Sequence, residues 1–332
     1  MERQRTIRWG ILSTAKIGIE KVIPAMQQAD HCEIVAISSR SGDRAREAAD
    51  QLDINRAVGS YEELLELPEV EAVYNPLPNH LHVPWSVKAL EAGKHVLCEK
   101  PIGLSADEAE KLLSETRKHP DLKVMEAFMY RHHPRWIRAK ELVESGILGK
   151  VRTIRSFFSY YNDDPENVRN KPDIGGGGLM DIGCYCISVP RFLFGEEPEQ
   201  VFGTREIDPD LGIDRLTSGV MEFPRGTATF TCATQLAPHQ SVRIFGTEGK
   251  MEIDMPFNAP VDQPTSIHLH TGEESRKISF EPSNQYTVQG ELFSKAILED
   301  KEVPTALEDA VANMKVIEAV VRSDIEGVWT GC

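Results

Sequence analysis

Residues 98–101 (Cys-Glu-Lys-Pro) put a lysine in a position that suits catalysis. The preceding residues 94–97 are typical of a buried strand, and ligands of open parallel sheets bind outside the carboxyl ends of the strands. The pKa of a lysine held there shifts readily through burial and neighbouring charges. Lys100 is therefore a candidate catalytic residue, and the alternative is a lysine that snorkels from a strand end into solvent.

A second candidate lies in residues 175–186 (GGGGLMDIGCYC). The four glycines let the backbone turn sharply or approach a ligand, and residues 179–194 then predict a helix. Asp181 and Tyr185 are four residues apart, so they share one face of that helix. A carboxylate one turn before a tyrosine suits acid–base chemistry. The alternative is a helix-start carboxylate followed by a core aromatic residue.

The six cysteines are scattered, which is typical of buried thiols in a reducing compartment and not of a disulfide framework. Cys184 and Cys186 have no second Cys or His pair at metal spacing nearby. The histidine pairs within residues 80–82 and 132–133 lack a matching carboxylate cluster. We therefore predict no metal site.

The elements that position Lys100 begin with a strand at residues 7–12, a turn at residues 13–18 and a helix at residues 19–28. This order is typical of a dinucleotide-binding unit, in which helix amides and the helix dipole hold a pyrophosphate. Ser13 and Ala15 replace the first two glycines of the usual G-x-G-x-x-G pattern, and both are small enough to let a phosphate approach. A plain strand–helix turn is the alternative.

The second predicted strand, residues 32–38, ends in Ser38-Ser39-Arg40. An NAD site places an acidic residue here to bind the ribose 2′-hydroxyl, and this strand end has none. Serine and arginine would instead accept a 2′-phosphate. We therefore predict NADP, with NAD as the alternative cofactor and an exposed loop arginine as the alternative role of Arg40.

Strands and helices continue to alternate to about residue 145, which predicts a mostly parallel sheet with helices on both faces. From about residue 151 short strands follow one another with short links, which predicts a large, open, mostly antiparallel sheet. The expected α/β fold has an N-terminal Rossmann-type domain at residues 1–126 and a C-terminal α+β domain at residues 127–332. We expect the closing helices, residues 284–299 and 306–323, to pack back on the first domain.

The bulk properties narrow the class of protein. A chain of 332 residues exceeds the roughly 250–300 residues at which single cores stop growing. A net charge of -15 argues against nucleic acid and anionic membranes as partners. With no signal peptide and no apolar run of about 20 residues, we expect a cytoplasmic protein. An open sheet with one uncovered face predicts a homo-oligomer, a dimer or a tetramer, through the C-terminal sheet.

Together these motifs resemble the glucose–fructose oxidoreductase/inositol dehydrogenase/rhizopine catabolism (Gfo/Idh/MocA) oxidoreductase family over nearly the whole chain. The segments at residues 9–12, 78–80, 99–101 and 175–185 occur in the family's order and spacing. Tyr185 stands where the family usually has histidine. This tyrosine is similar to the branch that holds glucose–fructose oxidoreductase, dimeric dihydrodiol dehydrogenases and NADP-dependent D-xylose 1-dehydrogenases.

The resemblance implies that Lys100 and Tyr185 are catalytic, that Asp181 lies beside the substrate and that the bond before Pro101 is cis. The predicted cofactor site comprises Ser13, Thr14, Ala15, Lys16, Ile17, Ser38, Ser39, Arg40, Pro76, Leu77, Asn79, His82, Glu99 and Lys100. The predicted substrate site comprises Arg131, Tyr161, Arg169, Asp181 and Tyr185.

The resulting hypothesis is an NADP(H)-dependent dehydrogenase that oxidises a sugar hydroxyl, at C1 of an aldose such as D-xylose. Lys100 would favour the phenolate of Tyr185, which accepts the hydroxyl proton. One alternative activity is trans-dihydrodiol oxidation, whose site would be lined by aromatic residues, whereas the polar residues 162–164 and 167–170 suit a polyol better. Another alternative is sugar-ketone reduction. A different class is a non-catalytic NADP-binding sensor.

Overall fold

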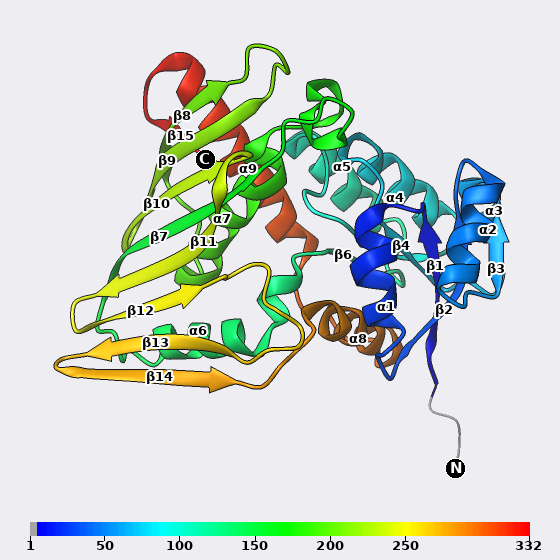
Figure 1. Cartoon of the computed structure of the whole chain (residues 1–332), viewed down its shortest axis with the longest axis horizontal. Helices are drawn as coiled ribbons and strands as arrows, with labels where there is room; N and C mark the ends of the chain where they lie inside the picture. The colour runs from blue at the N-terminus through cyan, green and yellow to red at the C-terminus, as the bar shows by residue number, and fades with distance from the viewer. Residues whose placement is uncertain (1–4) are drawn as a thin grey trace. The chain divides into compact units, whose positions relative to one another are not determined.

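The computed structural model describes residues 5–332, which form two compact units (Figure 1). Unit 1 comprises residues 5–129 and Asn284–Val311. Unit 2 comprises Tyr130–Ser283 and Ala312–Cys332. Within residues 5–332, no helix combines the length and the hydropathy that crossing a membrane requires.

Unit 1 contains a six-stranded parallel sheet in the order β3-β2-β1-β4-β5-β6. This is the strand order of a Rossmann fold, and it reverses between β1 and β4. The switch point therefore lies between the strands that lead into residues 13–18 and into residues 76–79. The strands are β1 (Ile7–Leu12), β2 (Cys32–Ser38), β3 (Arg56–Val58), β4 (Ala72–Asn75), β5 (His95–Cys98) and β6 (Val124–Glu126).

Helices cover both faces of this sheet. Successive residues of a strand point to opposite faces, so two neighbouring residues of β1 contact helices on opposite sides. On β1, Trp9 Nε1 donates to Ser294 Oγ of α8 at 3.1 Å. A Cβ on the next residue, Gly10, would lie 2.8 Å from Leu64 of α3 on the other face. The helices of unit 1 are α1 (Ile23–Met26), α2 (Gly42–Gln51), α3 (Tyr61–Leu65), α4 (His82–Glu91), α5 (Ala106–Thr116) and α8 (Gln285–Leu298), with a π-helix, η1 (Gly18–Val22), before α1 and a 3₁₀ turn, η2 (Asn79–Leu81), before α4.

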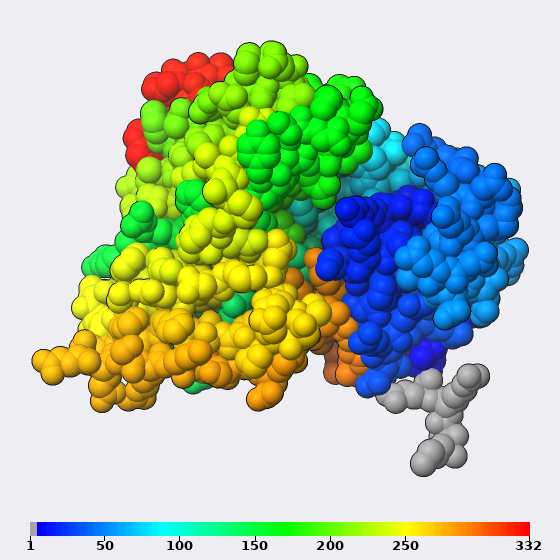
Figure 2. Space-filling model, viewed as in Figure 1, coloured from blue at the N-terminus to red at the C-terminus, as the bar shows by residue number. Residues whose placement is uncertain are grey.

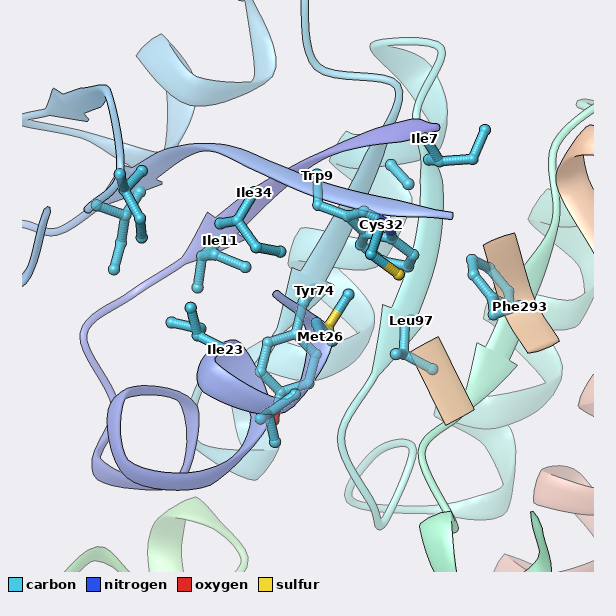
Figure 3. Packing of buried hydrophobic residues seen from close by; sticks show 14 of the residues in the cluster. Ile7, Trp9, Ile11, Ile23, Met26, Cys32, Ile34, Tyr74, Leu97 and Phe293 are labelled. Carbon is cyan, nitrogen blue, oxygen red and sulfur yellow. The ribbon is translucent and has the colours of Figure 1, made fainter. Parts of the chain in front are cut away.

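The core of unit 1 joins its first strand to α8, more than 270 residues later in the chain. The rings of Trp9 and Phe293 lie 5.6 Å apart, and both side chains are fully buried (Figure 3). Replacing a fully buried tryptophan by alanine costs about 3–5 kcal/mol. Unit 1 therefore needs α8 to close its core.

Unit 2 contains a nine-stranded sheet in the order β14-β13-β12-β11-β7-β10-β9-β8-β15. Only the β7–β10 pair is parallel, so the sheet is mostly antiparallel, as predicted. The strands are β7 (Val151–Tyr161), β8 (Gln200–Ile207), β9 (Asp214–Phe223), β10 (Gly226–Ala233), β11 (Gln235–Gly246), β12 (Gly249–Asp254), β13 (Thr265–Thr271), β14 (Glu274–Phe280) and β15 (Thr330–Gly331).

Helices cover one face of this sheet and leave the other face open. Figure 2 shows residues of β12–β14 at the surface with no helix in front of them. On the covered face, Gly203 of β8 donates to Ser323 Oγ of α9 at 3.1 Å. The helical segments of unit 2 are η3 (Met129–His132), α6 (Pro134–Glu144), η4 (Val168–Asn170), η5 (Pro172–Ile174), the π-helix η6 (Leu179–Gly183), α7 (Cys184–Phe194) and α9 (Leu307–Glu326), whose first residues belong to unit 1.

Candidate active-site residues in the two units

Lys100 lies in the turn that follows β5, and hydrogen bonds tie this turn to the ends of β4 and β6. Its peptide bond to Pro101 is cis, as the resemblance implied. Before it, the backbone N–H of Glu99 donates to Asn75 O at the end of β4, at 3.0 Å. After it, the N–H of Ile102 donates to Glu126 Oε1 at the end of β6, at 2.7 Å. The lysine therefore follows β5 on a turn anchored to the strands on either side.

The side chain of Glu99, a member of the predicted cofactor site, accepts a hydrogen bond from a buried phenol. Tyr74 Oη donates to Glu99 Oε1 at 2.7 Å. Burial and the charge of Glu99 raise the pKa of Tyr74, so its hydroxyl remains a donor. The same two causes raise the pKa of Tyr286 on α8. One phenol of unit 1 therefore donates to the Glu99 carboxylate, and the charge of Glu99 reaches a second.

The turn after β1 has the backbone of a glycine turn although its first position is serine. Ser13 has φ 100, a conformation that side chains rarely adopt and that clusters at ligand sites. Its N–H donates to Ser38 O at 3.1 Å, and its Oγ accepts from Ala15 N at 3.3 Å. The exposed Lys16 lies beyond Thr14 in this turn, and Ile17 leads into η1. The turn thus fits the phosphate-binding position of a dinucleotide site.

The end of β2 carries the predicted phosphate-binding arginine. Ser38 is buried and donates to Ile11 O at 2.9 Å, which fixes the strand end beside β1. Ser39 Oγ accepts from Ser41 N at 3.3 Å. Arg40 is exposed and lies near Tyr61, where burial raises the phenol pKa and Arg40 partly offsets that rise. An exposed cation without an acidic residue beside it in sequence fits a 2′-phosphate.

The loop after β4 is held by side chains of the residues that flank it, Asn75 and His82. Leu77 N donates to Asn75 Oδ1 at 3.3 Å, and the loop continues from Pro76 into η2, which begins at Asn79. The ring of His82 lies between two carbonyl oxygens, with Nε2 2.6 Å from Leu77 O and Nδ1 2.7 Å from Pro101 O. Both ring nitrogens therefore face the protein backbone, so His82 supports the loop instead of pointing a nitrogen at a ligand.

In unit 2, Asp181 has two partners that the structure places on either side of its carboxylate. Tyr160 Oη donates to Asp181 Oδ2 at 2.5 Å, and Arg169 Nε donates to Oδ1 at 3.1 Å. Burial and the charge of Asp181 raise the pKa of Tyr160, so this hydroxyl stays protonated. The carboxylate is therefore oriented by a neutral donor and a cationic donor.

Tyr185, one helical turn after Asp181, packs against three aromatic rings. Its ring centroid is 5.2 Å from Phe257, 5.9 Å from Tyr130 and 6.0 Å from Phe158. Phe158 and Tyr160 are two residues apart on β7, so they point to the same face of the sheet. Asp181 and Tyr185 therefore share one face, as the spacing predicted, with a polar and an aromatic neighbour respectively.

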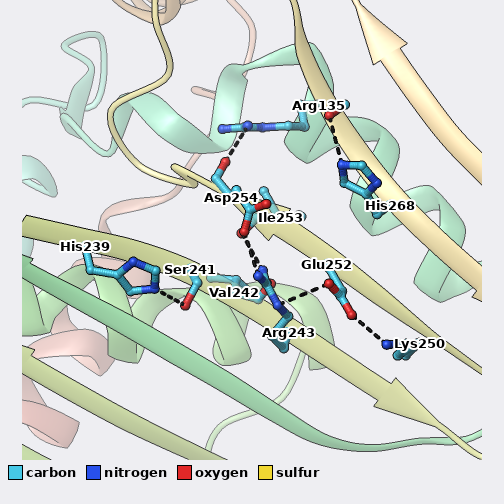
Figure 4. Close-up of polar contacts among 11 residues, drawn as sticks. Arg135, His239, Ser241, Val242, Arg243, Lys250, Glu252, Ile253, Asp254 and His268 are labelled. Atoms are coloured by element: carbon cyan, nitrogen blue, oxygen red, sulfur yellow. Dashed lines mark hydrogen bonds and ion pairs between the residues drawn. The ribbon is translucent and has the colours of Figure 1, made fainter.

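Two side chains of α6 fix the loop that carries Phe257. Arg135 donates to Asp254 O at 3.0 Å (Figure 4) and to Met255 O at 2.8 Å. Trp136 Nε1 donates to Pro256 O at 2.7 Å. Both side chains are almost fully buried. The hydrogen bonds hold the loop so that Phe257 packs on Tyr185.

The glycine run serves the chain's own packing. A Cβ on Gly177, which has φ 111, would collide with Asp214 Oδ1, and one on Gly176 would lie 2.6 Å from Arg169 O. Asp214 is buried and accepts from Leu179 N at 2.7 Å, so it caps the helix that carries Asp181 and Tyr185. The glycines let this helix start close to Asp214 and to Arg169.

Of the other predicted substrate residues, one lies on the opposite face of β7 and one is buried against α7, the helix of Tyr185. Tyr161 follows Tyr160 and so points to the opposite face of β7, where it is 62% exposed and donates to Asp163 Oδ2 at 3.1 Å. Arg131 is buried and donates to Ser188 Oγ at 2.7 Å. Sequence reasoning missed Tyr160, although the alternation of residues 151–160 placed it on a strand face.

A Rossmann-type unit and a second unit with an aligned carboxylate and tyrosine fit the class of dinucleotide-dependent oxidoreductases. A family model described as "Oxidoreductase family, NAD-binding Rossmann fold" matches residues 7–128. One described as "GFO/IDH/MocA C-terminal domain" matches residues 136–252. The chain belongs to the Gfo/Idh/MocA family and is an oxidoreductase.

Named relatives cover almost the whole chain. An "Uncharacterized oxidoreductase ORF334" of Rhizobium meliloti is 46% identical and covers 97% of this chain and 98% of that protein. A "D-xylose 1-dehydrogenase (NADP(+)) 2" of Haloferax volcanii is 40% identical over 95% of this chain and 96% of that protein. The structure of an aldose-aldose oxidoreductase from Caulobacter crescentus, complexed with glycerol, has a TM-score of 0.92 at 28% identity and covers 99% of this chain and 100% of that chain.

Proposed function

We propose that this protein is an NADP-dependent dehydrogenase that oxidises C1 of an aldose such as D-xylose. The observation that carries the proposal is the pair formed by Asp181 and Tyr185, which share one face beside β7. Asp181 is held by Tyr160 and Arg169, and Tyr185 lies among aromatic rings. The similarity to a D-xylose dehydrogenase that uses NADP supports the choice of substrate and cofactor.

The cofactor would be held by unit 1. The turn at residues 13–17 would bind the pyrophosphate, and the segment at residues 38–40 would bind the 2′-phosphate through Arg40. Residues 76–79 and 99–100 would lie beside the nicotinamide half. When bound there, the cofactor would supply the acceptor for the hydride that leaves C1.

The protein's own side chains would handle the proton. Tyr185 accepts the proton of the C1 hydroxyl, and the aldose leaves as the lactone. A tyrosine with its ordinary pKa of about 10 is a poor base at neutral pH, and an apolar surrounding disfavours the phenolate further. In the proposed mechanism Lys100 would supply the positive charge that favours the phenolate. Asp181 accepts a hydrogen bond from a second sugar hydroxyl and so orients the ring.

Replacement of either member of the proton-transfer pair tests this mechanism. We expect Tyr185→Phe and Lys100→Met each to reduce kcat with D-xylose and NADP by at least about a hundredfold, the usual scale of acid–base catalysis. The reaction is followed by the absorbance of NADPH across a panel of aldoses, polyols and trans-dihydrodiols. Near-normal turnover of Tyr185→Phe would contradict the mechanism, and activity with trans-dihydrodiols alone would contradict the substrate class.

A further inference from the structure

His82 is the first residue of α4, and its ring links two loops of unit 1. The side chain is 1% exposed. Nε2 lies 2.6 Å from Leu77 O, and Nδ1 lies 2.7 Å from Pro101 O. Leu77 belongs to the loop after β4, and Pro101 follows Lys100 after β5. One ring therefore connects the loop of the predicted cofactor site to the turn of the predicted catalytic lysine.

The backbone of His82 is held by a buried asparagine at the end of β4. Asn75 Nδ2 donates to the carbonyl of His82 at 3.0 Å and to Ser86 Oγ at 3.2 Å. Asn75 and Ser86 are fully buried. Because a buried carbonyl that loses its donor carries a desolvation penalty, this polar cluster favours one arrangement of the two loops.

The ring is neutral at neutral pH. Burial is the main cause that lowers the pKa of His82, to about 4, and the titratable groups that face it, Lys100 and His80, lower it further. A neutral imidazole carries one N–H and so donates to one carbonyl at a time. The contact with Pro101 O acts directly on the turn of Lys100, while the contact with Leu77 O acts on the neighbouring loop.

We propose that His82 is a positioning residue that fixes Lys100 through the carbonyl oxygen of Pro101. The inference rests on the proposed function, in which Lys100 favours the phenolate of Tyr185. When the turn is loosened, the lysine charge is misplaced, and misplacement by about 1 Å can cost a hundredfold in rate. The same loss of charge returns the base toward the ordinary tyrosine pKa of about 10.

Two amide substitutions separate the two contacts of the ring. The side-chain nitrogen of asparagine lies near the position of histidine Nδ1, and that of glutamine lies near Nε2. We therefore expect His82→Asn to keep the donor to Pro101 O and to retain kcat within about threefold. His82→Gln and His82→Leu should lower kcat by about tenfold or more. In the glutamine and leucine variants, the apparent pKa of the base in the pH profile of kcat should rise by about one unit.

A matched control comes from the other end of β5. His95 is half-buried, burial also lowers its pKa to about 4, and its Nδ1 accepts from Lys123 N at 3.0 Å. We expect His95→Gln to lower the melting temperature without moving the pH profile. An equal shift of the profile in His95→Gln and His82→Gln would show a general loss of structure and would overturn the proposal.

The Lys100→Met background separates this inference from the proposed function. If His82 acts through Lys100, adding His82→Leu to Lys100→Met should lower kcat by less than about twofold more. Multiplication of the two losses would overturn the role of His82 while leaving that of Lys100 intact. Full activity of Lys100→Met alone would instead contradict the proposed function. Unchanged kcat and pH profile in His82→Gln would also overturn the role of His82.

Discussion

At the scale of single residues, the carboxylate of Asp181 depends on a neighbour that does not itself need to touch substrate. Tyr160 Oη is its uncharged donor, at 2.5 Å. Removing that hydroxyl frees the carboxylate to turn and leaves one of its oxygens with one donor fewer. A hydrogen bond to a charged group contributes about 1.5–3 kcal/mol. We therefore expect Tyr160→Phe to raise KM for the sugar by about tenfold or more, with a smaller effect on kcat.

A hydroxyl on the opposite face of β7 provides the control for this effect. Ser159 Oγ donates to Ala237 O at 2.6 Å. Ser159→Ala removes a hydrogen bond of similar burial next to Tyr160 in sequence but away from Asp181. We expect a lower melting temperature and an unchanged KM. If Ser159→Ala and Tyr160→Phe raise KM equally, Asp181 is not the route of the effect.

Arg40 should decide which cofactor the protein prefers. It is exposed at the end of β2, where no acidic residue competes for its guanidinium in residues 38–40. We expect Arg40→Ser to weaken NADP binding by about tenfold or more and NAD binding by less than about threefold, because only NADP carries the 2′-phosphate. Cofactor titrations that follow tryptophan fluorescence measure both constants.

The control for Arg40 is Arg44→Ser, which removes an exposed arginine of α2 one turn further along. It lowers the net positive charge near the site by the same amount. We expect it to change neither constant by more than about twofold, since long-range surface charge is screened at physiological salt. Equal losses in both variants would mean that Arg40 contributes only general charge.

At the scale of elements, the glycine run matters because it lets the helix with Asp181 and Tyr185 begin beside Asp214. Gly177→Ala combines a positive φ with a collision against Asp214 Oδ1. Gly212→Ala is the matched control, because Gly212 has φ 70 but a Cβ there would lie 3.8 Å from its nearest neighbour. We expect about 1 kcal/mol of destabilisation for Gly212→Ala, from backbone strain alone. Gly177→Ala should lose clearly more stability, and also kcat, in urea unfolding and rate measurements.

The sequence predicted the helices and strands well where one buried face gives the apolar residues a regular spacing. The alternating strands and helices up to residue 145 and the helix over residues 179–194 are present. The two π-helical segments at Gly18–Val22 and Leu179–Gly183 were not predicted. They depend on how each helix start packs, which the residue pattern does not record.

Other features of the site were hidden from the sequence for similar reasons. Strand β14 has mostly exposed side chains, so it has no apolar alternation to reveal it. Phe257 meets Tyr185 only because Arg135 and Trp136 hold an irregular loop. Asp214 lies 33 residues after Asp181 in the printed sequence, yet it caps the same helix. Long-range contacts of this kind leave no local period.

At the scale of the whole molecule, the open face of the nine-stranded sheet predicts self-association. At about 4.8 Å per strand and 3.3 Å per residue, nine strands of about eight residues span an area of roughly 1,000 Å². A standard protein interface buries about 800 Å² on each partner. Near its centre lie Thr229 of β10 and, directly opposite on β9, Val220, both half-buried in the single chain. Hydroxyl and apolar side chains of β9 and β10 adjoin charged ones of β7 and β11, such as Arg155 and Arg243, on this face, and an interface of this size suits a second copy of the same face.

We therefore expect the protein to be a dimer or a tetramer in sedimentation experiments at micromolar concentration. Val220→Arg places a charge at the middle of the open face and, in a twofold interface, meets its own copy or is buried without a partner. It should shift the sedimenting mass toward the monomer while unit 1 still binds NADPH. The control, Ile137→Arg, replaces an apolar residue of α6 that is 47% exposed and should leave the mass unchanged. A wild-type chain that sediments as a monomer, or equal dissociation by both variants, would contradict association through the open sheet.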